Sequence, residues 1–326
     1  MTPPAPSVLV LGGTGFVGQH VCEKLQRAGW RITVPTRRAT SARHIQHLPG
    51  LTVVEASVHD DAALARLLPG HQAVINLVAI LHGSEAAFER THVQLPARLA
   101  RACLNAGVPR LVHVSALGVA TDSPSRYQRS KARGEQVLRD SGLELTVLRP
   151  SVIFGAGDRF LNLFAQLQSV FPVVPLAGAS ARFQPVWVED VADAAVACLR
   201  GDTVGKTFDA VGPDIMTLAD LVRAAGRYGS RQRPIIPLPM ALGRLQAMLM
   251  ELAPGEPLMS RDNLDAMSVD NVTTGQWPDL GALGISVSGI AAVAPTYLRG
   301  PPARSRLLAI RGHLSSRHRK EKGRRN

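Results

Sequence analysis

The sequence has few residues that could build a metal centre or a disulfide framework. Its three cysteines, Cys22, Cys103 and Cys198, lie 81 and 95 residues apart. Spacings this wide fit neither a zinc motif nor a set of disulfides, and unpaired thiols are typical of a reducing compartment. His44 and His47 lie three residues apart but lack a third ligand, so we expect no metal.

Long hydrophobic runs and aromatic residues are also scarce. No stretch of about 18 apolar residues occurs, which argues against a transmembrane helix. The N-terminal apolar run has no positively charged segment before it, which argues against a signal peptide. Aromatic residues make up 4% of a chain that is 45% hydrophobic, so aliphatic side chains must build the core. We expect a cytoplasmic protein, with a peripheral position on the inner face of a membrane as the alternative.

The positive charge is concentrated at the C-terminus. The chain has a formal charge of +12, and residues 297–326 hold ten Lys or Arg and one acid, or +9, which leaves +3 for the other 296 residues. This tail either attracts the phosphates of anionic lipid or is a solvated, disordered end. No nucleic-acid-binding motif accompanies it, so we expect no nucleic-acid partner.

Short β-branched runs alternate with helical patterns through the first two thirds of the chain. This alternation predicts βαβ units, hence a doubly wound parallel Rossmann sheet of the α/β class. The predicted strands are Ser7–Leu11, Arg31–Thr36, Leu51–Glu55, Ala73–Val78, Arg110–Ser115, Glu144–Leu148 and Lys206–Val211, and the main predicted helices are 16–28, Ala86–Ala106, Ser125–Ser141 and Trp187–Arg200.

The composition changes along the chain and suggests three parts. Residues 1–212 are predicted to form a dinucleotide-binding domain, in which 156–183 is a loop and helix insertion over the site. Within that insertion Phe171–Ala181 is predicted to be a loop, because it is rich in Pro, Gly and Ala. Residues 213–300 are predicted to form a smaller substrate or partner region, and 301–326 a disordered basic tail.

The C-terminal region contains a methionine-rich apolar segment. Pro234–Pro239 is expected to break the chain, and Met240–Leu252 is predicted to be a helix with Met240, Met248 and Met250. Such a helix usually belongs to the core. Methionine is also common on adaptable binding surfaces, so a lipophilic ligand such as a quinone, or a partner protein, is the alternative.

A glycine loop follows the first predicted strand and opens the first helix. Gly12 permits the tight turn, Gly15 allows the backbone to approach a pyrophosphate, and Gly18 allows the helix to pack on the strand. The helix N-terminus then offers free N–H groups to phosphates. Because the loop lies at the first strand–helix turn, it predicts a site for a nicotinamide dinucleotide.

The end of the second predicted strand bears on the choice of cofactor. Sites for NAD place an Asp or Glu there to hold the ribose 2′-hydroxyl. Here the strand ends in Thr36, Arg37 and Arg38. Two guanidinium groups can hold a 2′-phosphate, so we favour NADP(H), with NAD(H) as the alternative. The two arginines could instead be solvated surface charges.

Tyr127 and Lys131 lie four residues apart on one face of the predicted helix 125–141. A nearby ammonium lowers the pKa of a phenol, so Tyr127 could pass a proton to or from a substrate oxygen. The pair could equally be structural, holding bound nucleotide without catalysis.

These motifs together resemble the short-chain dehydrogenase/reductase superfamily, of the extended or atypical kind related to NAD-dependent epimerases and dehydratases. The shared segments are 12–18, 76–79, 113–115, 127–131, 148–150 and 185–190, in the family's order. The segments 74–82 and 260–264 are similar to bacterial relatives of the accessory NADPH-binding subunit of respiratory complex I. Such subunits hold their nucleotide without consuming it.

The resemblance implies roles for individual residues. Cofactor contacts are expected from Gly12, Thr14, Gly15, Phe16, Val17, Gly18, Thr36, Arg37, Arg38, Asn76, Ala79 and Lys131, and catalytic roles from Tyr127, Lys131 and Ser115. Two positions depart from the family. Leu117 stands where the family usually has its catalytic Ser or Thr, and Ser57 stands where many relatives have an Asp near the adenine.

Two functions follow from these observations. One is an oxidoreductase that moves a hydride between NADP(H) and a carbonyl or alcohol carbon, with Tyr127 as the acid/base. The other is a non-catalytic, NADPH-holding accessory or assembly protein of a respiratory or quinone-linked membrane complex, suggested by Leu117, the methionine-rich region and the tail. Arg149 could contact a substrate phosphate, although an ion pair with an acid is favoured, and Asp190 is expected to be a charge near a helix N-terminus.

Overall fold

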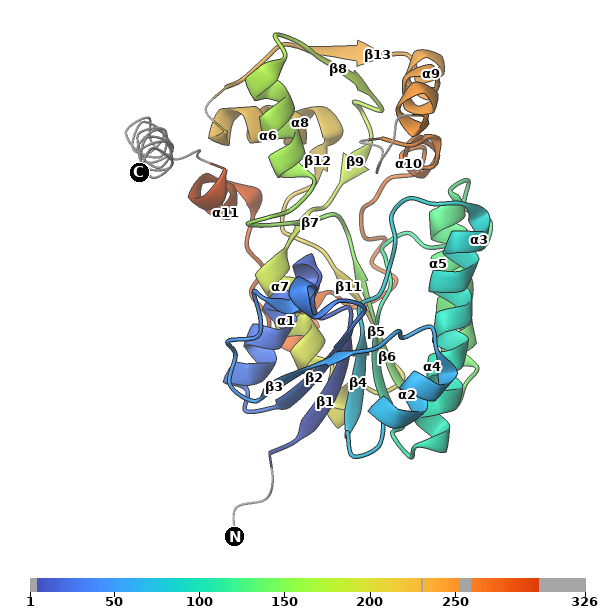
Figure 1. The fold of residues 1–326 in the computed structure, drawn as a ribbon. Helices are drawn as coiled ribbons and strands as arrows, with labels where there is room; N and C mark the ends of the chain where they lie inside the picture. The colour runs from blue at the N-terminus through green and yellow to red at the C-terminus, as the bar shows by residue number, and fades with distance from the viewer. Residues whose placement is uncertain (1–4, 230, 253–258, 299–326) are drawn as a thin grey trace, which may run out of the picture.

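The computed structural model describes residues 5–229, 231–252 and 259–298. A seven-stranded parallel sheet lies at its centre, in the order β11-β6-β5-β4-β1-β2-β3 (Figure 1). The strands are β1 Ser7–Leu11, β2 Arg31–Thr36, β3 Leu51–Glu55, β4 Ala73–Asn76, β5 Arg110–Val114, β6 Glu144–Pro150 and β11 Thr207–Ala210. The doubly wound α/β fold predicted from the sequence is confirmed.

Helices cover both faces of the sheet, which is why its strands are continuous apolar runs. Val8 and Val10 of β1 pack with α1 Phe16–Arg27 and α7 Val188–Ala197, whereas the alternate residues Leu9 and Leu11 face the opposite layer. That layer holds α2 Asp61–Leu67, α4 Leu95–Asn105 and α5 Arg126–Arg139. Short 3₁₀ turns occupy Ala39–Ala42, Gly201–Thr203 and Leu280–Leu283.

The helix predicted over Ala86–Ala106 is interrupted. It consists of α3 Glu85–Phe88, a π-helical turn over Glu89–Gln94, and α4. The π turn lies against α5 so closely that a Cβ on Gly134 would come within 1.7 Å of the His92 carbonyl oxygen. Gly134 therefore sets the distance between this turn and α5.

A second layer of structure lies above the carboxyl ends of the strands, and we call it the cap (Figure 1). Its elements are α6 Leu161–Val170, β8 Val174–Ala177, α8 Leu218–Tyr228, β13 Ile235–Leu238, α9 Met240–Glu251, α10 Arg261–Ala266 and α11 Ile290–Tyr297. Two further strand pairs join it to the sheet domain: β7 Ile153–Phe154 with β10 Val186–Trp187, and β9 Arg182–Phe183 with β12 Met216–Thr217. Side chains from α6, β8, α8 and α11 share one hydrophobic core.

Two sequence predictions in the cap are wrong. Phe171–Ala181 is not all loop, because Val174–Ala177 forms β8, and Pro234–Pro239 does not simply break the chain, because Ile235–Leu238 forms β13. The two strands pair in parallel as an isolated two-stranded sheet. Proline is tolerated on such edge strands, where one N–H direction needs no partner.

The predicted helix 240–252 is present as α9, but its assignment to the core is wrong. Only Gly243 and Ala247 are buried, whereas Leu242, Leu245 and Leu249 are about half exposed or more. A Cβ on Gly243 would lie 2.3 Å from the Cβ of Ala177, so small residues let α9 pack closely on β8. The leucines consequently remain outside.

Within the described residues no helix is long and apolar enough to cross a membrane. Cys22, Cys103 and Cys198 are all free and buried, as expected from their spacing, and burial raises the pKa of each thiol to about 12. The basic tail 301–326 lies outside the described residues.

Candidate functional site

The glycine loop makes the tight turn that its sequence predicts. Gly12 has a φ of +83°, and its carbonyl oxygen accepts a 3.0 Å hydrogen bond from the Gly15 N–H. A Cβ on Gly18 would lie 2.2 Å from that same oxygen. Only glycine fits at position 18, so helix α1 can begin directly against the turn.

The first turn of α1 is free of competing groups. Its N-cap is Gly15, which has no side chain to bond the first amides, and the turn contains no acid. Thr14, Phe16 and Val17 are partly exposed around it. From the other side, Gly155 approaches: a Cβ there would lie 3.7 Å from the Phe16 ring. The segment after β7 thus borders the loop.

Positive charge gathers near the ends of β2 and β3. Thr36 is buried, and its hydroxyl donates to the Arg38 carbonyl at 3.2 Å, whereas Arg37 and Arg38 are exposed. Burial and the charges of Arg90, Arg37 and Arg98 lower the pKa of His59. Three guanidinium groups therefore act on one place beside the strand ends.

Tyr127 and Lys131 occupy successive turns of α5, as predicted. The Lys131 Nζ donates a 2.8 Å hydrogen bond to the carbonyl oxygen of Val114, the last residue of β5. Burial lowers the pKa of Lys131 to about 8, and the nearby Glu135 opposes that shift. The ammonium is thereby fixed at the carboxyl end of the central strands.

The expected lowering of the Tyr127 pKa is wrong for this structure. Burial raises it to about 12. The ring lies edge-on to His92 and Phe88, at centroid distances of 5.4 Å and 6.2 Å. The cause is the loss of water around the phenolate, because burial disfavours the charged form of the phenol.

A hydrogen-bonded chain holds α5 against the end of β4. His92 Nε2 accepts from the Ile80 N–H at 3.1 Å, so its Nδ1 donates to the Ser130 hydroxyl, which in turn donates to the Tyr127 carbonyl at 2.7 Å. Burial and the charge of Lys131 lower the pKa of His92 to about 3. The neutral imidazole therefore serves as a fixed connector. This role had no signal in the sequence.

Asn76 is the last residue of β4, and Ser115 directly follows the neighbouring strand β5. The Asn76 side-chain N–H donates to His113 Nδ1 at 3.2 Å, and its oxygen accepts from the Val78 N–H. Ala79, predicted beside it, is exposed on the following loop. The Ser115 hydroxyl is buried without a hydrogen-bond partner. A buried hydroxyl without a partner marks a place where a ligand can supply one.

Leu117 is buried, and its N–H donates to the Pro150 carbonyl at 2.8 Å. The backbone at this position is therefore tied to β6. Position 117 thus has a buried apolar side chain where the family pattern has a hydroxyl.

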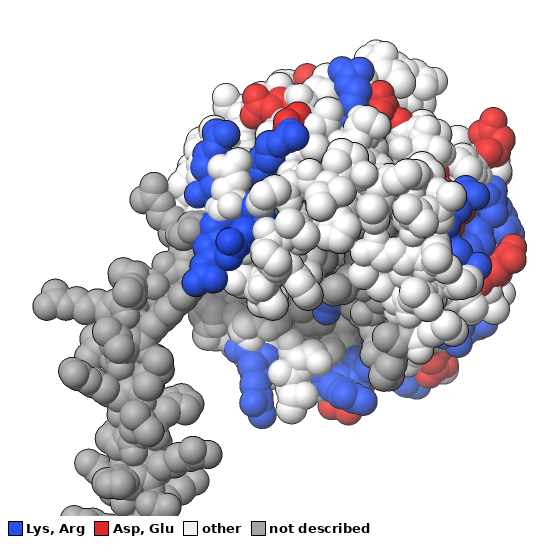
Figure 2. Space-filling model, turned by 90° about the horizontal axis from the view of Figure 1, so that it is seen from above, with Lys and Arg blue, Asp and Glu red and all other residues white. Residues whose placement is uncertain are grey.

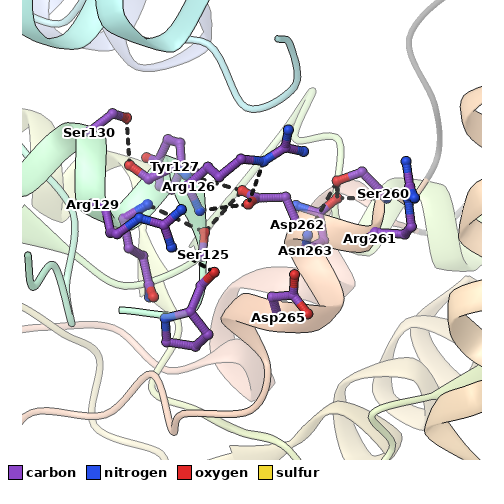
Figure 3. Close-up of polar contacts among 12 residues, drawn as sticks. Ser125, Arg126, Tyr127, Arg129, Ser130, Ser260, Arg261, Asp262, Asn263 and Asp265 are labelled. Carbon is purple, nitrogen blue, oxygen red and sulfur yellow. Dashed lines mark hydrogen bonds and ion pairs between the residues drawn. The ribbon is translucent and has the colours of Figure 1, made fainter. Parts of the chain in front are cut away.

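Asp262 of α10 closes the N-terminus of α5 from across the molecule (Figure 3). Its carboxylate accepts from the Arg126 N–H at 2.6 Å, the Tyr127 N–H at 3.1 Å and the Ser125 hydroxyl at 2.9 Å. Ser260 caps α10 in turn, by accepting from the Asn263 N–H. In the sequence, segment 260–264 indicated only the resemblance to complex I subunits. No sequence pattern predicted its contact with α5.

Other candidate residues have structural partners. Arg149 donates two hydrogen bonds to Glu135, at 3.1 Å and 2.6 Å, so the ion-pair interpretation is confirmed. Asp190 lies in the first turn of α7 as expected, and accepts from the Ser288 N–H. His20, Glu23 and Glu189 lie close enough for a metal, but Glu189 already pairs with His20 and Lys24.

Comparison with known proteins settles the family. The profile of the NAD dependent epimerase/dehydratase family matches residues 8–210, more than half of the chain. The chain belongs to this family. It is also 35% identical over 300 residues to NADH dehydrogenase (ubiquinone) 1 alpha subcomplex subunit 9, mitochondrial, of Mus musculus, covering 89% of this chain and 79% of that protein. The resemblance drawn from the sequence motifs is thus confirmed.

A second relative is named as an enzyme. The chain is 31% identical over 235 residues to a ceramide reductase of Caulobacter vibrioides, covering 71% of this chain and 73% of that protein. Among solved structures, a dTDP-glucose 4,6-dehydratase from Streptomyces venezuelae shares the fold, with a TM-score of 0.70 and 20% identity over 89% of this chain and 95% of that one. The proteins to which the chain is similar thus include a respiratory-complex subunit and proteins named as enzymes.

Proposed function

We propose that this protein is an NADP(H)-dependent oxidoreductase that acts on a carbonyl or alcohol group, with Tyr127 as the acid/base. The observation that carries the proposal is the meeting of three groups at the carboxyl end of β5. The Lys131 ammonium bonds Val114, the unpartnered Ser115 hydroxyl follows one residue later, and Tyr127 lies one turn from Lys131.

The residues fit a nicotinamide dinucleotide. The turn at Gly12 and Gly18 leaves the first amides of α1 open to a diphosphate, and the Ser115 hydroxyl lacks a partner where the reactive ring would lie. When bound, the nicotinamide supplies or accepts the hydride. Glycines 12, 15 and 18 would hold the diphosphate, Asn76 and Ala79 would border the ring, and Lys131 would hold its ribose.

The protonation state of Tyr127 favours reduction. With a pKa of about 12, its hydroxyl remains protonated at neutral pH and can donate to the oxygen of a carbonyl substrate. The buried Lys131 ammonium would stabilise the phenolate left behind, because an opposite charge in a low-dielectric site favours the ionised form. Ser115 would offer that oxygen a further hydrogen bond.

The choice of NADP(H) over NAD(H) is supported by charge. β2 ends without an acid, Arg37 and Arg38 are exposed beside it, and Arg90 and Arg98 add to the local field. A 2′-phosphate carries the charge that such a cluster binds through paired hydrogen bonds. The ceramide reductase relative supports a lipophilic carbonyl substrate, and a quinone is the alternative.

The test uses the purified protein and its nucleotide. Denaturation should release NADP(H), and Tyr127→Phe should lower the rate of substrate reduction by about 10²–10⁴-fold while retaining nucleotide. Tyr228→Phe, a half-buried tyrosine of α8 in the cap, is the matched control and should leave the rate unchanged. Unchanged turnover in Tyr127→Phe would refute the role of the phenol.

A second candidate is a nucleotide-holding accessory protein of a respiratory membrane complex. It is favoured by Leu117, which replaces a catalytic hydroxyl with a buried apolar side chain, and by the similarity to the mouse respiratory subunit. In this case NADPH would stay bound, and no ketone, ceramide precursor or quinone would oxidise it. Removal of residues 303–326 would also weaken retention of the protein on membranes at low salt, since the tail is strongly basic.

A further inference from the structure

The outer end of the cap exposes apolar side chains from two distant parts of the sequence. Val170 ends α6 and Phe171 follows it, Ile236 lies on β13, and Leu242, Leu245 and Leu249 lie on α9. We call these six residues the cap face. Their exposed fractions run from 49% for Ile236 and Leu245 to 73% for Val170.

The six residues lie on elements that adjoin one another. β8 and β13 pair side by side, with Pro175 opposite Ile236, and α9 packs on β8 through Gly243 and Ala177. Figure 1 places the α6–β8 connection, β13 and α9 together at the end of the molecule farthest from the N-terminus. Single exposed leucines are common, but a contiguous apolar surface of this kind indicates an interaction site.

The leucines of α9 repeat on one side of the helix. Leu242, Leu245, Leu249 and Leu252 are spaced by three, four and three residues, which places them on one stripe that points away from β8. With Gln246 and Met250, three of them line a shallow hollow on the surface. Leu252, at the end of the stripe, is 77% exposed.

Positive charge predominates around the cap face. Residues 161–181 contain no Lys, Arg, Asp or Glu, although charged residues make up 19% of the chain. Within 231–252 there are three arginines and one acid, Glu251, which pairs with Arg261. No carboxylate among the described residues pairs with Arg231 or Arg233; these bond the carbonyls of Ser169 and Gln168. Figure 2 shows a largely uncharged surface, with Lys and Arg and also some Asp and Glu at its margins.

We propose that the cap face is a docking surface for an anionic lipid bilayer. Apolar side chains would enter the boundary between head groups and acyl chains, and the arginines at the margin would meet lipid phosphates. A protein partner would need a surface of matching shape that places its own acids opposite these arginines. A bilayer requires only apolar area and unneutralised positive charge, and both are present here.

Docking in this way is separate from the basic tail and from catalysis. None of the six cap-face residues is among those assigned to the cofactor or the catalytic site, so variants of the cap face should bind nucleotide normally. Docking itself does not rest on the proposed function.

The experiment is sedimentation of the full chain with vesicles of phosphatidylcholine, with and without phosphatidylglycerol. Leu245→Ser/Leu249→Ser should lower the bound fraction on phosphatidylglycerol vesicles by roughly tenfold or more, because two leucines no longer enter the boundary. Arg231→Gln/Arg233→Gln should lower binding by about fivefold for each arginine, and only on anionic vesicles. The matched control, Leu104→Ser/Val204→Ser, removes two exposed apolar side chains of the sheet domain, 49% and 37% exposed, and should bind normally.

Other outcomes would overturn the proposal. The first is that the cap-face variants bind vesicles to the same extent as the unaltered chain does. The second is that removal of residues 303–326 abolishes vesicle binding while the leucine variant still binds. The tail alone would then be responsible for binding. A third is cap-dependent binding to native membranes but not to lipid vesicles, which would identify a protein partner. Should the leucine variant fail to fold, Phe171→Ser makes the same measurement from a separate connection.

Discussion

The carboxylate of Asp262 accepts a hydrogen bond from the backbone N–H of Tyr127, 135 residues earlier in the chain. It also accepts from the Arg126 N–H and the Ser125 hydroxyl. One buried acid thus pairs with two backbone amides at the start of α5 that have no partner within the helix, and its negative charge interacts favourably with the positive end of the helix dipole. The helix that carries Tyr127 and Lys131 is therefore held in place from the cap.

Replacing Asp262 should destabilise the protein through α5. Asp262→Ala leaves buried N–H groups without an acceptor and should lower the free energy of unfolding by about 3 kcal/mol, and Asp262→Asn by less, because one oxygen is retained. Urea denaturation measures both. Asp265→Ala, which breaks only the more exposed pair with Arg244, should cost at most about 1 kcal/mol. Equal losses at the two positions would contradict a special role for Asp262.

The buried Lys131 should make stability depend on pH. Its pKa falls from 10.5 to about 8 in the folded chain, so between these values the unfolded state binds more protons. The contribution of Lys131 to the free energy of unfolding should therefore rise as the pH increases from about 8 to 10.5. The measurement is the difference between the unaltered protein and Lys131→Met across that range.

The comparison with Lys131→Met is needed because other groups titrate in or near the same pH range. The three buried thiols have raised pKa values of about 12, so they reduce stability above pH 9 in both proteins and cancel. A difference that is flat between pH 8 and 10.5 would mean that Lys131 keeps an ordinary pKa in the folded state.

Arg37 should set the preference for the phosphorylated cofactor. Arg37→Ala should raise the Kd for NADPH by about 10–100-fold, since a charge-assisted hydrogen bond to phosphate contributes about 1.5–3 kcal/mol, and should barely change the Kd for NADH. Calorimetric titration of the nucleotide-free protein measures both constants. Arg31→Ala, at the opposite end of β2, is the control. Parallel losses for the two nucleotides would show that Arg37 does not read the 2′-phosphate.

Gly18→Ala should abolish nucleotide binding. Its Cβ would meet the Gly12 carbonyl at 2.2 Å, so α1 would have to move away from the loop. Overpacking of this kind costs about 1–3 kcal/mol in stability. At Gly201 an added Cβ meets nothing within 4 Å, so Gly201→Ala should leave both thermal unfolding and nucleotide binding unchanged.

The strands of the central sheet could be predicted because their information is local. Ser7–Leu11, Arg31–Thr36 and Leu51–Glu55 begin and end where the apolar, β-branched runs predict. In the cap the pattern failed, because β8 and β13 contain prolines that usually break structure. Their pairing joins residues about 60 positions apart, and no local pattern reports it.

The site was predictable in part for the same reason. The glycine loop and the Tyr127–Lys131 spacing are short motifs, and each lies on the element that its sequence indicated. The pKa of Tyr127 was not predictable, since it depends on how deeply the folded chain buries the ring. The contact of Asp262 with α5 depends on the packing of the cap.

The strand order has a consequence for synthesis on the ribosome. Six of the seven strands of the sheet are complete once Pro150 has been made, and the glycine loop precedes them all. β8 must wait for β13, and the Ser125 end of α5 must wait for Asp262. The glycine loop and most of the sheet can therefore form before β13 and α9, with its exposed leucines, have been made.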